Sequence, residues 1–202
     1  AAERAAEVSG VPIINAGDGA GQHPTQALLD LYTIERELGH VDGAHVCIIG
    51  DLRYYRSARS LSYLLGKFDN VKITGVSSKE LAMSDELKDY LKERGVTYEE
   101  TESLDEVMKE ADVIYQTRIQ KERLSPEAYE RTRGQYIIDR TRADSMKEGG
   151  IIIHPLPRVG EITPEVDDSP HAVYFRQIGY GLIVRMALLS TILDPKNQGL
   201  LD

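Results

Sequence analysis

Residues 45–57 read HVCIIGDLRYYRS. The unbroken apolar run Val46-Cys47-Ile48-Ile49 is typical of a strand covered on both faces, as in a parallel sheet. The polar segment after Gly50 leads into residues 57–68, whose apolar side chains recur at helical spacing. This stretch therefore predicts a strand, a loop and a helix in succession, which is the first half of a βαβ unit.

The same rhythm continues along the chain. A second unbroken apolar run, Ile151-Ile152-Ile153, predicts another buried strand, and Pro24–Leu38 predicts an amphipathic helix that ends before Gly39. A last helix is predicted from Arg176 to Leu193, stopped by Pro195. Further strands are predicted at 11–15, 71–76, 96–99, 112–116 and 136–139. Short connections between alternating strands and helices favour an α/β fold with a doubly wound open parallel sheet, Rossmann-like in architecture.

Composition excludes several classes of protein. The chain has 202 residues, 41% of them hydrophobic, and a formal charge of −9. The acidic balance argues against a nucleic-acid-binding surface, and no apolar stretch approaches the roughly 18 residues of a membrane span. A single cysteine, Cys47, excludes internal disulfides and cysteine-based zinc modules. These features predict a cytoplasmic protein with no membrane or nucleic-acid partner.

Ligands of doubly wound sheets bind beyond the carboxyl ends of the strands, so the residues there matter most. Residues 15–26, NAGDGAGQHPTQ, join a predicted strand to a helix, and glycines let backbone N–H groups approach an anion. The dinucleotide fingerprint fails because Gln22 stands where a third glycine is needed. His23 and Gln26 lie three residues apart at the helix start, where a histidine can donate to a developing oxyanion. The alternative is that His23 only caps the helix.

Two predicted strands are followed by arginines. Arg56 falls in the first turn of a predicted helix, where a cation gains nothing from the helix dipole, so it indicates an anionic ligand. Arg118 and Gln120 alternate onto one side of an extended segment, and a guanidinium with an amide can bind a carboxylate. The alternatives are a solvated arginine at 56 and a charged surface loop at 117–123.

The predicted strand at 150–154 is followed by His154-Pro155-Leu156-Pro157-Arg158. Its two prolines fix the backbone and leave carbonyl groups in set directions, where they can accept hydrogen bonds from an amine or amide. The alternative is a stiff connection without a binding role. Taken together, these loops predict a pocket for a small, multiply anionic ligand, with Arg56 and Arg118 at opposite ends of one cleft that also contains His23.

Five stretches in the same order resemble the aspartate carbamoyltransferase catalytic chain. They are Asn15–Gly19 with Gln22–Gln26, Gly50–Leu52, Thr117–Arg123, His154–Arg158, and Tyr174–Gln177 with Arg185–Leu189. The His-Pro-Thr-Gln and Pro-Leu-Pro-Arg runs look like the aspartate enzyme, because ornithine-using relatives typically carry cysteine at both places.

The resemblance implies transfer of a carbamoyl group from carbamoyl phosphate to the amine of L-aspartate, a step of pyrimidine biosynthesis. It implies that His23 hydrogen-bonds the carbonyl oxygen as the tetrahedral intermediate forms. Gln26, with the backbone of Leu156 and Pro157, would hold the carbamoyl amide.

For the second substrate, the resemblance implies that Arg56 binds the α-carboxylate of aspartate, and that Arg118 with Gln120 binds its side-chain carboxylate. It implies no metal and no organic cofactor, because orientation and oxyanion stabilisation supply the catalysis. It also implies a homotrimer with shared active sites and raises the prospect of a regulatory subunit.

The resemblance divides the chain into three parts: residues 1–25, a remnant of the carbamoyl-phosphate domain and the start of a hinge helix; residues 26–174, the aspartate-binding domain; and residues 175–202, a helix returning to the first domain. The family's Ser-Thr-Arg-Thr phosphate loop does not occur in these 202 residues. Tyr55 stands where the family usually has glycine and Tyr180 where asparagine is usual, so both local packings are expected to differ.

Two other functions remain open at this stage. The first is a catalytically inactive binding or assembly module of the same ancestry, favoured by the missing phosphate loop. The second is a nicotinamide-dependent dehydrogenase, which fits the sheet but not the glycine pattern. In either case, the apolar faces of the helices at 24–38 and 176–193 predict a chain that associates readily.

Overall fold

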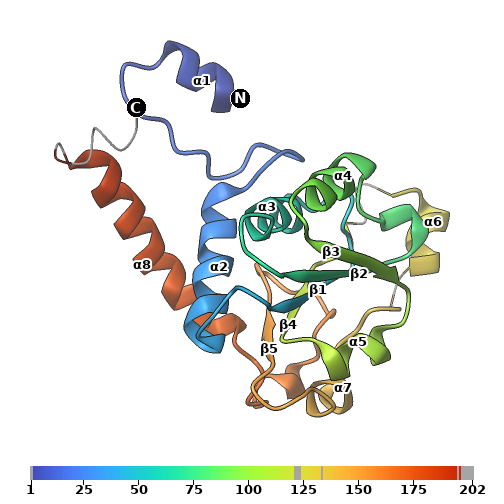
Figure 1. Ribbon diagram of the computed structural model, residues 1–202. Coiled ribbons are helices and arrows are strands. Elements are labelled where there is room, and N and C mark those ends of the chain that lie inside the picture. The colour runs from blue at the N-terminus through green and yellow to red at the C-terminus, as the bar shows by residue number, and fades with distance from the viewer. Residues whose placement is uncertain (1, 121–123, 133, 195, 197–202) are drawn as a thin grey trace.

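A computed structural model describes residues 2–120, 124–132, 134–194 and 196. Its centre is one sheet of five parallel strands in the order β3-β2-β1-β4-β5 (Figure 1). The strands are β1 (His45–Ile49), β2 (Lys72–Val76), β3 (Thr97–Thr101), β4 (Val113–Gln116) and β5 (Ile151–Ile153). The chain runs outward from β1 to β3 and then returns to the other side of β1, so β1 and β4 flank the topological switch point. The expected α/β fold with a doubly wound parallel sheet is confirmed.

Helices cover both faces of the sheet. The described helices are α1 (Ala2–Val8), α2 (Pro24–Leu38), α3 (Arg56–Leu65), α4 (Asp85–Glu93), α5 (Leu104–Glu110), α6 (Pro126–Thr132), α7 (Arg140–Asp144) and α8 (Tyr174–Leu193), of which α1 lies apart from the sheet (Figure 1). Two 3₁₀ turns, Lys79–Leu81 and Pro164–Val166, lie in the connections. The helix predicted at Pro24–Leu38 has the expected bounds, because Pro24 fits its first turn and Gly39 takes the left-handed conformation at its end.

Alternate residues of each central strand feed two separate cores. Val46 and Ile48 of β1 belong to the core on the side of α2, α3 and α4. These three helices contribute Ile34, Leu61 and Leu91, respectively, to the same core. Cys47 and Ile49 face the opposite core beneath α5 and α7. Burial on both faces explains why these strands are apolar without interruption.

Two predicted strands are not formed. Residues 11–15 have no regular structure, and Val11 and Ile13 are 70% and 42% exposed, so the apolar run lacks a strand to pair with among the described residues. Residues 136–139 contribute only one bridge, from Ile138 to Ile162. An apolar β-branched run favours a strand but is insufficient without a neighbour to complete the ladder.

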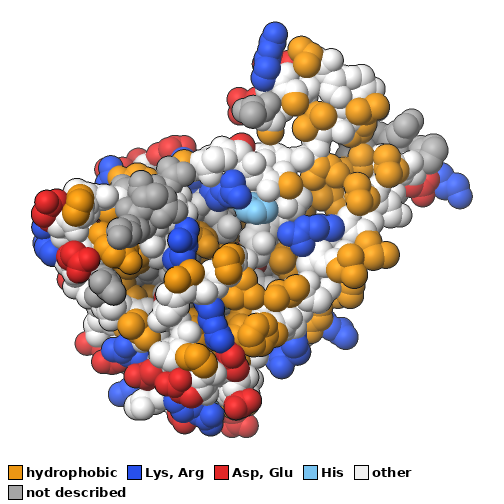
Figure 2. All heavy atoms as spheres, turned by 180° about the vertical axis from the view of Figure 1, so that it is seen from behind, with side chains coloured by type: hydrophobic (Ala, Val, Ile, Leu, Met, Phe, Trp, Pro, Cys, Tyr) orange, Lys and Arg blue, Asp and Glu red, His pale blue; other side chains and the backbone are white. Residues whose placement is uncertain are grey.

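Helix α8 leaves the body alongside α2 and extends away from the sheet (Figure 1). Its base is tied to α2, where Arg176 and Tyr180 both reach the carboxylate of Glu37, at 2.8 Å and 2.7 Å. Tyr180, which stands where the family usually has asparagine, thus connects α8 to α2 through its hydrogen bond to Glu37. Beyond this base the helix exposes a long apolar surface (Figure 2), formed by Phe175, Ile178, Leu182, Ile183, Met186, Leu189 and Leu193.

Among the described helices, none combines the length and the apolar character that crossing a bilayer requires. Pro195 and residues 121–123, which belong to the predicted helix stop and one sequence motif, lie outside the described residues.

Candidate active site

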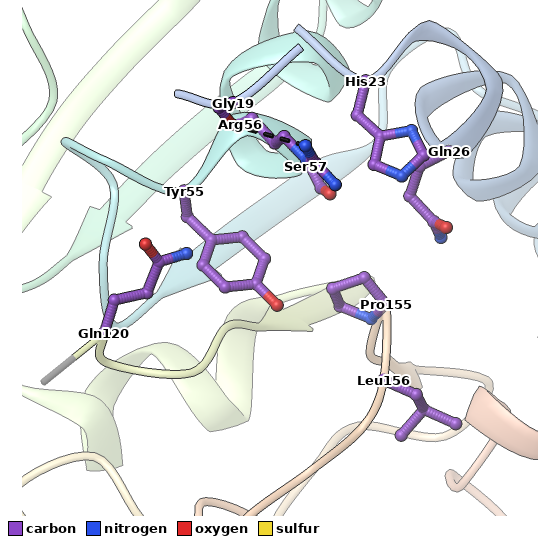
Figure 3. A pocket seen from close by; sticks show the side chains of 9 residues that line it. All are labelled: Gly19, His23, Gln26, Tyr55, Arg56, Ser57, Gln120, Pro155 and Leu156. Atoms are coloured by element: carbon purple, nitrogen blue, oxygen red, sulfur yellow. Dashed lines mark hydrogen bonds between the residues drawn. The ribbon is translucent and has the colours of Figure 1, made fainter. Parts of the chain in front are cut away.

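A cavity of about 550 Å³ opens at the carboxyl edge of the sheet, where the loops after β1, β4 and β5 meet the start of α2. In Figure 3 the Tyr55 ring points into it between Gln120 and Pro155, with His23 and Gln26 on the opposite side. On the face shown in Figure 2, Lys and Arg side chains surround a histidine in a hollow. The lining residues are Gly19, His23, Gln26, Tyr55, Arg56, Ser57, Gln120, Pro155 and Leu156.

The loop after β1 is fastened to the end of β4. Gly50 has φ +104°, and a Cβ there would lie 2.7 Å from the carbonyl oxygen of Thr117, so only glycine allows this approach. The Thr117 hydroxyl accepts from the Asp51 backbone N–H at 2.8 Å, and the Asp51 carboxylate accepts from Tyr54 N–H at 2.8 Å. These bonds turn the chain so that Tyr55 and Arg56 face the cavity.

Arg56 lies against a glycine backbone. Its guanidinium donates a long hydrogen bond of 3.4 Å to the Gly19 carbonyl oxygen. A Cβ on Gly17 would lie 2.7 Å from the Arg56 Cζ, and Gly17 has φ +123°. The glycine loop therefore makes room for a guanidinium, and residues 15–22 curve over the first turn of α3.

His23 stands at the N-terminal end of α2, and its backbone N–H donates to Ser60 Oγ of α3 at 2.8 Å. Its side chain makes no capping hydrogen bond to the helix, so the capping alternative fails. Burial lowers the pKa of His23, and the charges of Arg56 and Arg185 lower it further. Both effects favour the neutral imidazole, which keeps one ring N–H that can donate to a developing oxyanion.

Gln26 lines the cavity one turn into α2, and its Nε2 donates to Asp30 Oδ1 at 2.7 Å. Asp30 is fully buried and receives two further donors, Gln177 Nε2 at 2.6 Å and the Tyr115 hydroxyl at 2.8 Å. Burial raises the pKa of Asp30 to about 7, although the three hydrogen bonds act in the other direction. A carboxylate buried this deeply beside a ligand cavity marks a functional site.

The loop after β5 is held by its own histidine. His154 Nδ1 accepts from Leu156 N–H at 2.7 Å, and His154 Nε2 lies 2.8 Å from Glu161 Oε1. Because Nδ1 is an acceptor here, the ring proton lies on Nε2. Leu156 has φ +53°, an unfavourable region for a side chain with a Cβ, and precedes a cis peptide bond to Pro157. The histidine thereby fixes the Pro155–Leu156 wall of the cavity.

The structure brings together five of the seven predicted site residues: His23, Gln26, Arg56, Gln120 and Leu156. The expectation that Arg56 and Arg118 share one cleft needs correction, because Arg118 lines a neighbouring cavity with Thr117, Ile119 and Glu161. Pro157 does not line the first cavity, where Pro155 stands instead. Arg118 and Gln120 would face the same side of an extended segment, but they line different cavities, so the segment after β4 does not present both side chains to the cavity of His23.

Tyr55 lines the first cavity, and the charge of Arg118, which lines the second, acts on its hydroxyl group. Burial raises the pKa of Tyr55 to about 12, so its hydroxyl stays protonated and can donate. The ring of Tyr55 lines the same cavity as Arg56.

Sequence reasoning missed four contributors: Tyr55 and Ser57 in the lining, Asp30 behind Gln26, and the charge of Arg185 near His23. Ser57 and Arg185 stood within quoted motifs, whereas Asp30 carried no local signal. No group of three or more His, Cys, Asp or Glu side chains suited to a metal ion occurs in the part of the chain that the structure describes.

Comparison with known families decides the ancestry of this site. Residues 42–192 match the family described as aspartate/ornithine carbamoyltransferase, Asp/Orn binding domain, and residues 1–36 match its carbamoyl-P binding domain. The chain belongs to the aspartate/ornithine carbamoyltransferase family. The resemblance in the sequence motifs is thereby confirmed.

Relatives within the carbamoyltransferase family cover nearly the whole chain. Aspartate carbamoyltransferase 2, chloroplastic, of Pisum sativum is 54% identical over 96% of this chain and 51% of its own length. The aspartate carbamoyltransferase catalytic subunit of Methanocaldococcus jannaschii is 50% identical over 98% of this chain and 64% of its own length. This carbamoyltransferase chain therefore spans between one half and two thirds of these relatives.

Solved structures agree with the fold. The catalytic subunit of M. jannaschii aspartate transcarbamoylase matches with a TM-score of 0.88 at 49% identity, covering 96% of this chain and 63% of that one. Aspartate transcarbamoylase of Trypanosoma cruzi, in complex with carbamoyl aspartate and phosphate, matches with a TM-score of 0.90 at 42% identity, covering 95% and 62%.

The cytoplasmic location that was predicted from the composition is wrong. Similar carbamoyltransferases of pea, rice and Arabidopsis are named chloroplastic. An acidic chain with one cysteine fits a plastid as well as a cytoplasm, so these features do not distinguish the compartments.

Proposed function

We propose that this chain supplies the L-aspartate-binding half of an aspartate carbamoyltransferase, which transfers the carbamoyl group of carbamoyl phosphate to L-aspartate in pyrimidine biosynthesis. The observation that carries the proposal is the convergence of His23, Gln26, Arg56 and Gln120 on one cavity at the switch point of the sheet. The choice of aspartate over ornithine is supported by the relatives, which are named aspartate carbamoyltransferases, and by Thr25 and Pro155 in the two diagnostic motifs.

The reaction forms one C–N bond and breaks one C–O bond. The unprotonated amine of aspartate attacks the carbonyl carbon, negative charge gathers on the carbonyl oxygen, and phosphate leaves as the tetrahedral intermediate collapses. The nitrogen sheds one proton, and the products are N-carbamoyl-L-aspartate and phosphate. In this scheme a neutral His23 donates to the carbonyl oxygen, and removal of one such donor typically costs a hundredfold or more in rate.

The remaining groups bind and orient the substrates. Gln26 and the backbone at Leu156 and Pro157 hold the carbamoyl amide, while Arg56 binds the α-carboxylate. Arg118, with Gln120, binds the side-chain carboxylate. Because Arg118 lines the second cavity, this role requires its guanidinium to turn toward the first cavity when the ligand is bound. Charge-assisted hydrogen bonds of this kind contribute roughly 1.5–3 kcal/mol each.

A carbamoyl-phosphate-binding partner is part of the proposal. The apolar surface of α8 is unusually extensive, with Leu182 and Leu193 66% and 71% exposed, and the chain spans about half the length of its pea relative. Patches of this kind mark interaction sites. We propose that a carbamoyl-phosphate-binding unit packs here, and that the assembly is a homotrimer.

The test is an assay of N-carbamoyl-aspartate formation by this chain alone, by a separately produced carbamoyl-phosphate-binding domain, and by their mixture. Activity confined to the mixture supports the proposal. Arg56→Gln should lower activity at least tenfold, whereas Arg53→Gln, an exposed arginine three residues earlier, serves as the matched control.

Absence of both activity and L-aspartate binding from the mixture would favour the inactive binding or assembly module instead. Light scattering on the active mixture tests the trimer separately, because a monomer that retains full activity would contradict it.

A further inference from the structure

Asp30 is a buried acid that the proposed mechanism does not use. It lies in α2, one turn beyond Gln26, with none of its surface exposed, and it meets three donors from three different elements. Gln26 belongs to α2, Tyr115 to β4, and Gln177 to α8. A charged group at such a junction costs folding free energy unless every lone pair finds a donor, so its presence calls for a reason.

The arrangement of donors sets the orientation of Gln26. Gln26 Nε2 and Gln177 Nε2 both donate hydrogen bonds to Asp30 Oδ1. The Tyr115 hydroxyl donates to Asp30 Oδ2. A carboxylate only accepts hydrogen bonds, so the NH₂ end of the Gln26 carboxamide must face Asp30. Its Oε1 end is therefore left for the cavity that Gln26 lines.

Gln177 extends the same network to the opposite wall. Its Nε2 donates to Asp30, and its Oε1 accepts from the His154 backbone N–H at 3.0 Å. His154 in turn fixes Leu156 through its Nδ1. One carboxylate thus connects Gln26 on one side of the cavity with the Pro155–Leu156 wall on the other.

We infer that Asp30 is a positioning residue that presents Gln26 Oε1 as a hydrogen-bond acceptor, so that the site selects a ligand carrying an N–H donor beside its carbonyl group. This inference rests on the proposed function and deepens it. The carbamoyl group carries such an NH₂, whereas an acetyl group of nearly the same shape carries a methyl that cannot donate. A site that hydrogen-bonds an N–H discriminates strongly against an analogue lacking it.

The experiment measures kcat/KM for carbamoyl phosphate and for acetyl phosphate in the active mixture described above. Asp30→Leu keeps the volume but removes the acceptor, and it should reduce the preference for carbamoyl phosphate by at least about tenfold. Asp30→Asn keeps Oδ1 as acceptor for both amides and offers Nδ2 toward Tyr115, so it should retain the preference. Thr33→Val is the matched control, because the buried Thr33 hydroxyl bonds only its own helix, at the Leu29 carbonyl.

A merely structural role would lower both kcat/KM values together and leave their ratio unchanged, which would overturn the inference. If Asp30→Leu does not fold, Asp30→Ser replaces it, because serine is too short to reach Gln26. Hydrogen exchange of the Gln26 side-chain amide, measured by NMR on the 202-residue chain, provides the second readout. Slow exchange in the wild type and Asp30→Asn but fast exchange in Asp30→Leu supports the positioning.

The two proposals fail in distinguishable ways. A wild-type mixture that turns over neither phosphate contradicts the proposed function and the substrate part of this inference. Fast exchange of the Gln26 amide in the wild type contradicts the positioning itself, whatever the activity.

Discussion

The burial of Asp30 makes a quantitative prediction about pH and stability. Its pKa is about 7 in the folded protein against an ordinary value of 3.8, because desolvation outweighs its three hydrogen bonds and the charge of Arg185. The folded state therefore holds this proton more tightly than the unfolded chain. The resulting contribution to stability is fully present below pH 3.8 and is lost as the pH rises through 7.

The magnitude follows from the shift. About three pKa units at 1.36 kcal/mol each correspond to about 4 kcal/mol in total, of which about 2.6 kcal/mol is lost between pH 5 and pH 8. Asp30→Asn preserves the hydrogen bonds but cannot ionise. Its free energy of unfolding should therefore rise relative to the wild type by about 2–3 kcal/mol across this pH range.

Urea unfolding followed by far-UV circular dichroism at pH 5, 6, 7 and 8 measures this difference, and the chain contains no tryptophan to follow instead. Other titrating groups occur in both proteins, so they cancel when the two unfolding free energies are subtracted. The free energy of unfolding of Thr33→Val should differ from that of the wild type by the same amount at every pH. Parallel curves for Asp30→Asn as well would refute the assignment of a raised pKa to this carboxyl group.

Three further predictions concern the site and its surroundings. Arg56→Gln should raise the pKa of His23, because it removes a cation that opposes protonation, and an unchanged imidazole titration by NMR would contradict this. Gly17→Ala should destabilise the chain by about 1 kcal/mol or more and weaken the proposed binding of L-aspartate, because its Cβ meets Arg56 at φ +123°; calorimetry of binding and unfolding tests both effects. Replacing Leu182 and Met186, which are 66% and 60% exposed, by lysine should reduce self-association in light scattering without lowering stability; an unchanged oligomer size would place the contact elsewhere.

Much of the fold was predictable because its physical signals are local. Pro24 and Gly39 mark the two ends of α2, and the apolar runs at 46–49 and 151–153 could be satisfied only by strands covered on both faces. The loops that follow parallel strands must meet at one edge of the sheet, so His23, Arg56 and Gln120 could be placed together from the sequence alone.

The pairing of strands could not be predicted from local signals of this kind. Residues 11–15 have the composition of a strand, but a strand forms only where a neighbour completes its hydrogen bonds, and Val11 remains 70% exposed instead. Composition likewise could not indicate a compartment, because neither net charge nor a single cysteine distinguishes the cytoplasm from the plastid for which similar chains are named.

The residues themselves determined the order of strands and helices, the motifs at the strand ends and the family. The tertiary structure decided which of those motif residues share a cavity: it placed Gln120 in the cavity of His23, placed Arg118 in a second cavity, and brought Gln177 from 147 positions away onto Asp30. The physical reason is the distance along the chain over which each effect acts. Propensity and periodicity act over a few residues, whereas burial of a carboxylate and the direction of a guanidinium depend on side chains that only folding brings within 3 Å.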